Sequence, residues 1–258
     1  MPKYVLGHHL KGEGVRLNLM SELLDPIHRR CIAALGAFKP GARTLEVGCG
    51  NGSISGWLAE RVSPGGTAVA VDLDLSLVHL RMPNLELRKA DIVAGPVERG
   101  TFDLVTARAV LHHVADAEAA IVNMIASLKP DGALLLIEPD FLPISIAEPP
   151  QVRAFWDGWI AWSREQGIDY FIGRTLAPRL ASLGLANITS TAETAIYNGD
   201  SPWAEYWKET ITELRSELLT SGKLDEALID EFLAHCGDSN WWTQTIAFTA
   251  VHGHKRGG

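Results

Sequence analysis

Three alternating glycines and a carboxylate are the residues of this sequence whose types and spacing best suit a nucleoside ligand. Gly48, Gly50 and Gly52 stand between a short β-type run and an amphipathic helical pattern. Glycines there let a ligand approach the main chain closely, and the following helix points its N-terminal amides at the same place. Asp72 ends the next apolar run, where a carboxylate can hold the two hydroxyls of a ribose. The combination predicts an adenosine-type site.

The spacing of the glycines separates the ligand classes that use such loops. Nicotinamide-dependent oxidoreductases carry GxGxxG, whereas this chain has GxGxG. A Walker loop would continue with Gly-Lys-Ser/Thr, which does not follow here. Glu46, two residues before the first glycine, would repel a diphosphate and attract a sulfonium or ammonium cation. The loop therefore favours a cationic adenosyl ligand.

Four motifs in order resemble those of the class I S-adenosylmethionine-dependent methyltransferases, in particular the small-molecule branch related to ubiquinone biosynthesis. LEVGCGNGS is similar to the family's first motif, AVDLD to the second, KADIV to the third and FDLVTARAVLHHV to the fourth. LKPDGALLLIEP is similar to the region of its fifth strand, so the resemblance covers about residues 1–140. It implies in-line transfer of a methyl group from S-adenosyl-L-methionine to an oxygen, nitrogen or carbon atom of a small metabolite.

The resemblance also implies which residues hold the methionine part of this cofactor. The loop backbone would face it through Gly48, Cys49, Gly50 and Asn51. Glu46 would lie close to the ammonium group, which the Ala107 carbonyl would also approach, and Tyr4 would fold over the cofactor as a lid. Many relatives have Asp in place of Glu46 and a glutamine-like polar residue in place of Met20. The second difference leaves the contact of the first helix to the cofactor open.

The adenosine part would be held at the ends of the next two strands. By the same resemblance, Asp72 takes the ribose hydroxyls and Leu73 packs on the adenine. Asp91 and the amide of Ile92 would hydrogen-bond to the edge of the adenine. Asp91 capping a turn is the alternative.

Two adjacent histidines are the candidates for proton transfer. Methyl transfer from a sulfonium needs mainly in-line positioning, but an oxygen or nitrogen acceptor can require a base. His112 and His113 follow the fourth expected strand at its C-terminal end, where ligands bind in such sheets. We favour His113 as the residue that faces the site, either as base or as a contact to the cofactor. Packing and structural hydrogen bonding are the alternative for the pair.

Glu138 and Asp140, at the end of the fifth expected strand, raise the question of a metal. Metal-dependent catechol-type methyltransferases need a further carboxylate at the end of the fourth strand, where this chain has Thr106-Ala107-Arg108. We therefore expect no metal. The two carboxylates would contribute polarity on the acceptor side or form a strand-end turn.

Seven of the eight tryptophans lie after residue 150, which makes the second half chemically distinct. One stripe at helical spacing suits a planar or apolar acceptor through stacking; it consists of Trp203, Tyr206 and Trp207. Core packing is the alternative for this stripe and for a second one, Phe155, Trp159 and Trp162.

The elements that must position these residues alternate between strand and helix. Strands are expected at 44–47, 67–71, 85–89, 102–106, 133–137, 187–196 and 242–251. Helices are expected at 12–37, 53–62, after the N-cap Asp116, and at 150–166, 174–183, from Ser201-Pro202, and 224–236. The first helix is indicated by apolar residues at about every fourth position, Val15, Leu19, Leu23, Ile27 and Cys31, and Asp131-Gly132 would form a turn.

This order predicts an α/β fold with a Rossmann-like, doubly wound, mostly parallel seven-stranded sheet. An N-terminal helix and helical insertions, near 147–170 and 201–237, would add a cap. We expect one domain over 1–258, with the cofactor in 1–140 and the acceptor mainly in 141–258.

The composition excludes several partners. The formal net charge is −8 over 258 residues, and a basic stripe for nucleic acid or an anionic membrane is missing from the sequence. The three cysteines form no CxxC pair, and neither a secretory signal nor an apolar run of about 20 residues is present. We expect a cytoplasmic protein with a small-molecule acceptor; the oligomeric state stays open.

Other functions remain open at this point. The fold could bind S-adenosylmethionine and carry out cyclisation, decarboxylation or regulation. Release of S-adenosylhomocysteine during turnover would distinguish methyl transfer from these functions. A nicotinamide-dependent oxidoreductase is opposed by GxGxG and by the lack of a clear Tyr-x-x-x-Lys pair. A nucleic-acid or protein methyltransferase is opposed by the acidic balance.

Overall fold

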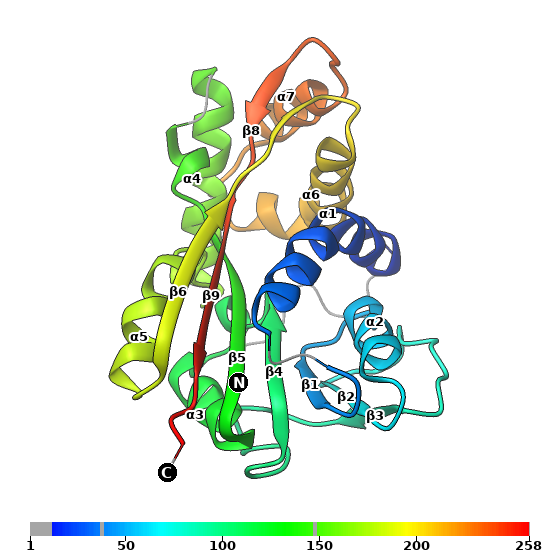
Figure 1. Cartoon of the computed structure of the whole chain (residues 1–258). Helices are drawn as coiled ribbons and strands as arrows, with labels where there is room; N and C mark the ends of the chain where they lie inside the picture. Colours follow the sequence, from blue (N-terminus) through cyan, green and yellow to red (C-terminus); the bar gives the residue numbers. More distant parts are fainter. Residues whose placement is uncertain (1–11, 37–38, 147–148, 258) are drawn as a thin grey trace.

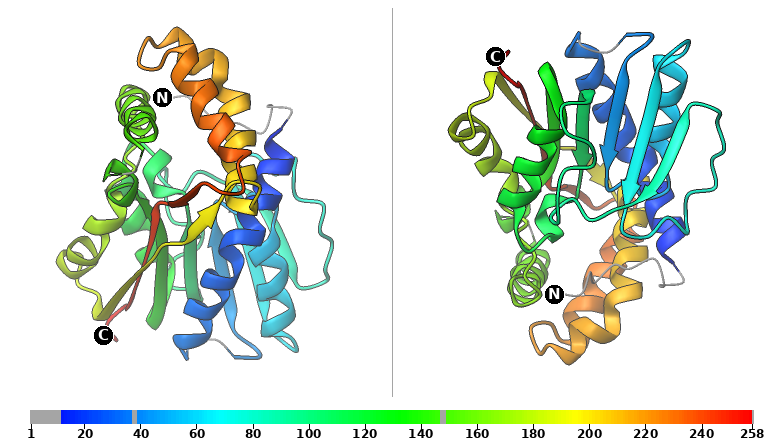
Figure 2. Two further views of the ribbon diagram at one scale, coloured as in Figure 1. Left: turned by 90° about the horizontal axis from the view of Figure 1, so that it is seen from above. Right: turned by 90° about the horizontal axis from the view of Figure 1, so that it is seen from below.

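The computed structural model describes residues 12–36, 39–146 and 149–257. A seven-stranded sheet runs through it in the order β3-β2-β1-β4-β5-β9-β6, with helices on both faces (Figures 1 and 2). Its strands are β1 (Arg43–Val47), β2 (Thr67–Asp72), β3 (Leu85–Lys89), β4 (Phe102–Arg108), β5 (Leu128–Asp140), β6 (Ala186–Glu193) and β9 (Ala247–His254). The first five are parallel, and β9 lies antiparallel between β5 and β6. The predicted doubly wound, mostly parallel sheet is confirmed.

Apolar side chains on both faces of the central strands explain the two helical layers. Along β5, Leu134 and Leu136 enter one core, and Leu135 and Ile137 enter the other, because successive residues of a strand point to opposite faces. The first core packs against α3 (Ala117–Ser127) and α5 (Leu176–Ser182). The second packs against α1 (Glu13–Ala34), α2 (Ser53–Val62), α4 (Pro150–Glu165), α6 (Pro202–Thr220) and α7 (Glu226–Cys236).

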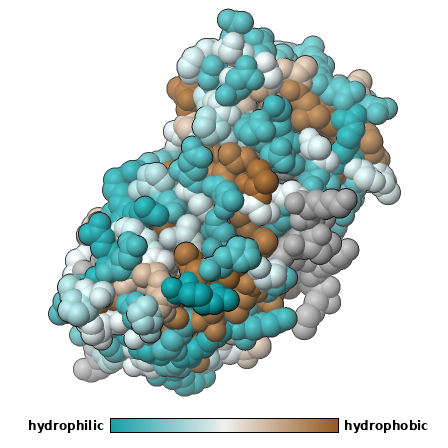
Figure 3. Space-filling view, turned by 90° about the vertical axis from the view of Figure 1, so that its right-hand side faces the viewer, coloured by the Kyte–Doolittle hydropathy of each residue, from teal (hydrophilic) through white to brown (hydrophobic). Residues whose placement is uncertain are grey.

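Helices α4, α6 and α7 stand beyond the carboxyl ends of the central strands, at the top of Figure 1, and form the predicted cap. The predicted N-caps are present: Asp116 accepts from Ala119 N at 2.9 Å and Ser201 accepts from Ala204 N at 3.3 Å. In the space-filling view of Figure 3, apolar side chains form several separate patches among hydrophilic ones. Within the described part of the chain, no helix is long and apolar enough to cross a bilayer.

Two of the expected strands are shorter than predicted, because within each expected range the chain passes from one sheet to another. The strand expected at 242–251 is wrong as one element: β8 (Trp242–Gln244) pairs with β7 (Ile196–Asn198) in a separate two-stranded sheet, and β9 follows. At the crossing, Thr245 N donates to Ala195 O at 2.9 Å, and Thr194 Oγ1 donates to Thr245 O at 2.9 Å. These bonds satisfy the backbone where it leaves the main sheet.

The strand expected at 133–137 is longer than predicted. β5 begins at Leu128, which pairs with Phe102. Asp131 adopts a φ of 64°, and the register shifts between Phe102 and Leu104. The predicted turn at 131–132 is therefore an irregularity inside a strand.

The apolar stripe predicted for α1 packs against the core only in part: Leu23, Ile27 and Cys31 are partly buried there. Val15 is 53% exposed, and the helix buries a face that includes several charged or polar side chains: Glu13, Arg16, Asp25 and His28. Each of them has a partner at short distance. Arg16 Nη2 lies 2.6 Å from Glu13 Oε1, Arg108 Nη1 lies 2.8 Å from Asp25 Oδ1, and His28 Nε2 lies 2.7 Å from Thr106 Oγ1. Pairing offsets the cost of burying these groups.

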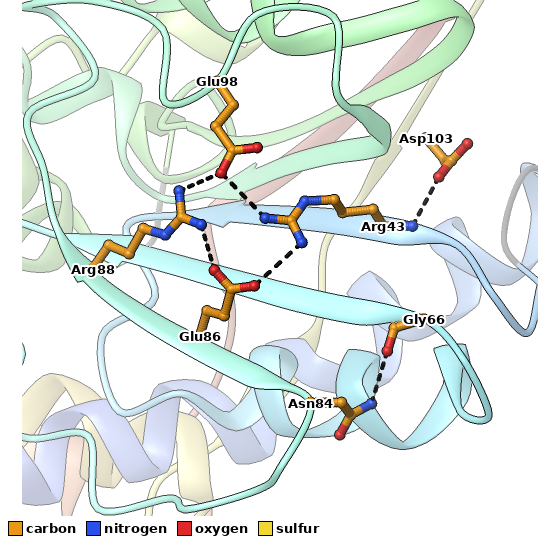
Figure 4. Close-up of polar contacts among 7 residues, drawn as sticks. All are labelled: Arg43, Gly66, Asn84, Glu86, Arg88, Glu98 and Asp103. Carbon is orange, nitrogen blue, oxygen red and sulfur yellow. Dashed lines mark hydrogen bonds and ion pairs between the residues drawn. The ribbon is translucent and has the colours of Figure 1, made fainter.

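An ion-pair network holds the edge of the sheet (Figure 4). Arg43 of β1 reaches Glu86 at 3.2 Å and Glu98 at 3.1 Å, and Arg88 of β3 contacts the same two carboxylates. The Arg88 guanidinium, with Arg43 beside it, lowers the pKa of both glutamates. Because these side chains are partly exposed, each pair contributes about 1 kcal/mol or less, and the network acts mainly in fixing β3 to β1.

Candidate active site

The glycine loop leaves β1 and enters α2 with its three glycines in the left-handed region. The φ values of Gly48, Gly50 and Gly52 are 70°, 55° and 84°. A Cβ at Gly48 would lie 2.3 Å from Val110 Cγ2, so this position requires glycine for space as well as for backbone conformation. Gly48 N and Cys49 N donate to the carbonyl at the end of β2, Val71 O, at 2.8 and 3.2 Å. The loop is thus fixed to the strand that carries Asp72.

The Asp72 carboxylate is oriented by two backbone amides. Gly50 N donates to Oδ2 at 3.0 Å, and Asp74 N donates to Oδ1 at 3.2 Å. Each oxygen keeps a further acceptor site, so the carboxylate can take two hydroxyls of a ribose beside the loop. The contact of Asp72 with a ribose stays a prediction.

The residues predicted for the adenine lie next to Asp72. Ala90 N donates to Asp72 O at 3.0 Å, which joins the chain after β3 to the end of β2. Leu73 is 57% exposed. Asp91 is exposed, and its Oδ1 accepts from Val93 N at 2.9 Å. The structure therefore brings Leu73 and Asp91 into one neighbourhood, and their contacts to adenine stay predictions.

Three of the remaining residues predicted to contact the cofactor have buried side chains. Ala107 is buried in β4, level with Val47 and Leu136 of the neighbouring strands. Ile92 is buried as well. The Cys49 side chain packs under the loop with Ala70 and Val78, so that only its backbone is available to a ligand. Tyr4 lies outside the described residues.

Helix α1 covers the loop, a contact that the sequence motifs did not reveal. Asn51 Nδ2 donates to Asn18 Oδ1 at 3.0 Å, and Ser21 Oγ donates to Asn51 Oδ1 at 3.2 Å. Leu17 lies 3.5 Å from the position of a Cβ at Gly50. The side chain of Asn51 thus binds α1 to the loop, while the predicted contact of its backbone with the cofactor is a separate role.

Glu46 lies beneath the loop. The side chain is 4% exposed, and Ser55 Oγ of α2 donates to its Oε2. Burial raises the pKa of Glu46 to about 8, against the opposing effects of Ser55 and of Arg108. The carboxyl is therefore mainly protonated at neutral pH in the protein as it stands, and its proximity to a ligand ammonium stays a prediction.

We expect Glu46 to make the protein less stable as pH rises. The folded chain keeps the Glu46 proton up to about pH 8, whereas the unfolded chain releases it near pH 4.5, so stability falls through this interval. Between pH 5.5 and 7.5 the loss is about 2 kcal/mol. Denaturant unfolding of wild type and Glu46→Gln across this range measures it: the difference between the two proteins should grow with pH. Parallel curves would contradict the assignment.

A cavity of about 40 Å³ lies beyond the carboxyl ends of β4 and β5. Six aromatic side chains line it: Phe141, Trp159, Tyr170, Tyr206, Trp207 and Phe248. The predicted stripe thus contributes Tyr206 and Trp207, whereas Trp203 stacks behind the wall on Phe248, with ring centroids 6.0 Å apart. Since a cavity of about 150 Å³ accepts benzene, an acceptor with a ring needs these side chains to separate.

The second aromatic stripe is divided between cavity and core. Trp159 lines the cavity, whereas Phe155 and Trp162 are buried in the core. Core packing is thus the role of two of its three members.

Both candidate histidines line the cavity, with ring centroids 3.8 Å apart. His112 Nδ1 lies 2.7 Å from Oε2 of Glu138, which is fully buried. Val110 N and Leu111 N each donate to Glu138 Oε1 at 2.8 Å. Glu138 therefore fixes the turn after β4, Leu111–His113, together with the His112 ring.

The titration of this pair follows from its burial. Burial raises the pKa of Glu138 to about 7, although the backbone donors oppose the shift. Burial lowers the pKa of His112 to about 3 and lowers that of His113. Both imidazoles are therefore neutral near pH 7. When Glu138 is ionised it accepts from His112 Nδ1, which leaves Nε2 as an acceptor.

Glu138 and Asp140 already have other partners. Asp140 accepts from Arg174 Nε at 2.7 Å and Arg174 Nη2 at 2.5 Å, and Glu138 is used by the turn after β4. Among the residues that the structure describes, no group of three or more His, Cys, Asp or Glu is arranged to hold a metal ion.

The loop and the cavity share a wall. Ala109 lines the cavity, and the next residue, Val110, packs on Gly48. On α1, Arg16 and Met20 line the cavity, while Leu17 meets the loop at Gly50. A ligand on the loop and a second ligand in the cavity would therefore be neighbours.

Comparison with known proteins agrees with this arrangement. The chain is 36% identical over 132 residues to a ubiquinone biosynthesis O-methyltransferase of Xanthomonas campestris pv. campestris, covering 48% of this chain and 54% of that protein. It is 30% identical over 140 residues to nocamycin O-methyltransferase of Saccharothrix syringae, covering 51% of this chain and 47% of that protein. The matched segment thus spans about half the length of these relatives.

Among solved structures, the fold is similar to that of phosphoethanolamine N-methyltransferase 2 of Haemonchus contortus, with a TM-score of 0.57 and 16% identity. The likeness covers 87% of this chain and 51% of that one. The model of the family described as "Methyltransferase domain" matches residues 17–190, which include the glycine loop, Asp72 and the Glu138–His112 pair. The chain belongs to this methyltransferase family.

Proposed function

We propose that this chain transfers a methyl group from S-adenosyl-L-methionine to a small molecule in the aromatic cavity. The observation that carries the proposal is the wall shared by the glycine loop and the cavity, at Ala109 and Val110. Asp72 would hold the ribose, and the loop backbone would hold the methionine part. When bound, the cofactor supplies a methyl group activated by its sulfonium.

The chain's own residues would position the acceptor and take its proton. We propose His112 as the base for a hydroxyl or amine acceptor, with Glu138 as a positioning residue that keeps Nδ1 protonated. The sequence favoured His113, whereas the contact with Glu138 favours His112. His113, whose ring lies against His112, would contact the cofactor or the acceptor.

The nature of the acceptor is part of the proposal. Aromatic side chains on several sides of the cavity support a planar or apolar acceptor. The acceptor site also takes Arg16 and Met20 from the first half of the chain, and both halves supply strands to one sheet. This supports treating 1–258 as one domain. A cytoplasmic location stays a prediction.

Isothermal titration with S-adenosyl-L-methionine tests the proposal first, and we expect micromolar-scale affinity. Incubation with the cofactor and candidate acceptors should then release S-adenosylhomocysteine and give a product heavier by one methyl group in place of hydrogen. Absence of binding would contradict the proposal. Binding with conversion of an acceptor, but without S-adenosylhomocysteine, would point to cyclisation or decarboxylation instead.

A further inference from the structure

Two tryptophans that line the aromatic cavity carry buried indole N–H groups without a hydrogen-bond partner among the described residues. They are Trp159 of α4 and Trp207 of α6, whose side chains are 1% and 2% exposed. An indole N–H can only donate, and an unpaired buried donor costs about 1–3 kcal/mol. A ligand atom in the cavity that pairs with them would remove this cost.

The charges and donors around the cavity favour an oxygen as that atom. Arg16 lines the same space, and its Nη1 donates to Tyr206 Oη at 3.4 Å while Nε and Nη2 donate to Glu13. On the side of the turn after β4, the His112 ring stands in front of Glu138. The α1, α4 and α6 side of the cavity is thus rich in donors, and the His112 side supplies an acceptor nitrogen.

The two sides of the cavity are connected through Tyr170. Its ring centroid is 6.5 Å from that of Trp159 and 5.3 Å from that of His112. The Trp159 and Trp207 rings are nearly perpendicular, at 84°, with centroids 6.0 Å apart. They give two apolar walls that meet at an angle and that must move apart to admit one flat molecule with polar groups at two ends.

We propose that the methyl acceptor carries a carbonyl or carboxylate oxygen that accepts hydrogen bonds from the indole N–H groups of Trp159 and Trp207, while a separate hydroxyl of the same molecule faces His112. This inference rests on the proposed function and narrows its substrate class. Pairing removes the cost of two unsatisfied donors, so the cavity discriminates against analogues that lack the oxygen.

The indole signals of 15N-labelled protein, saturated with S-adenosylhomocysteine, report this contact directly. Trp159→Phe and Trp207→Phe assign the two signals. Three matched probes are added in turn: 3-hydroxybenzoate, 3-hydroxyacetophenone and m-cresol. We expect both indole protons to shift downfield with a probe that carries the oxygen and to shift little with m-cresol. Comparison of the first two probes distinguishes carboxylate from carbonyl.

Affinity gives the second readout. Each Trp→Phe variant should bind the preferred probe about 10-fold more weakly, equivalent to about 1.4 kcal/mol, and should bind m-cresol as wild type does. Trp241→Phe is the matched control, because its indole N–H also lacks a partner among the described residues but the side chain does not border the cavity. Equal binding of the three probes, or of none, would overturn the inference. Indole shifts in a protein that does not bind S-adenosyl-L-methionine would instead overturn the proposed function, and the contact would then belong to a ligand other than a methyl acceptor.

Discussion

Replacement of Asp72 by alanine is expected to weaken binding of S-adenosyl-L-methionine about 100-fold or more. The carboxylate is held by Gly50 N and Asp74 N, so it meets a ribose without reorganisation. Two hydrogen bonds to a charged acceptor contribute about 3–4 kcal/mol together, which corresponds to a factor on the order of 100 to 1,000. Isothermal titration of wild type and variant measures the loss.

Two further variants separate this effect from damage to the loop. Asp72→Asn keeps one acceptor for Gly50 N but lacks the charge, and we expect an intermediate loss. Asp91→Ala removes a carboxylate that accepts from Val93 N in an exposed turn, and its effect on affinity should be smaller, about 10-fold or less. Thermal unfolding of each variant checks the fold. Unchanged affinity in a folded Asp72→Ala protein would remove Asp72 from the site.

The sheet and the cofactor side of the site were predictable because their signals are local. Apolar runs on both faces mark buried parallel strands, and the positions of Gly48, Gly50 and Asp72 at strand ends follow from the same pattern. Carboxyl ends of parallel strands share one edge, so residues far apart in sequence could be expected to meet there. The seven-stranded sheet confirms the predicted architecture, and the contacts of these residues with a cofactor stay predictions.

The buried face of α1 was not predictable from apolar spacing. Arg16, Asp25 and His28 are buried because partners from other elements or neighbouring turns reach them, among them Arg108 and Thr106 of β4. Such pairing depends on tertiary contacts, which periodicity does not contain. The buried face therefore contains Leu24 and Ile32 together with charged residues.

The partner of the histidines was missed for a related reason. From the sequence, Glu138 is expected to contribute polarity on the acceptor side or to form a strand-end turn, and its separation from His112 along the chain gives no sign of their contact. The available signal was topological: β4 and β5 are neighbours, with Ala107 level with Leu136, so residues just beyond them must meet. A buried acid at the end of one central strand and a histidine after the next would have predicted the pair.

Replacement of Glu138 by glutamine is expected to lower kcat by a factor on the order of 100 to 10,000. Val110 N and Leu111 N donate to Oε1, so the amide oxygen should keep that place and turn its NH2 toward His112. Nδ1 of His112 would then accept, and Nε2 would carry the proton and no longer act as a base. Release of S-adenosylhomocysteine, with an acceptor that supports turnover, measures kcat.

The pH dependence distinguishes this positioning role from a merely structural one. In wild type, kcat should rise with pH to a plateau, because the base is competent only when Glu138, with its pKa near 7, has lost its proton. The rise of kcat with pH should be absent in Glu138→Gln and present in His113→Ala. The affinity of Glu138→Gln for S-adenosyl-L-methionine should stay within about 3-fold of wild type, since this change does not touch the Asp72 carboxylate. A folded Glu138→Gln protein that keeps both the rise of kcat with pH and the wild-type kcat would contradict the positioning role of this carboxylate. The proton would then leave the acceptor by another route.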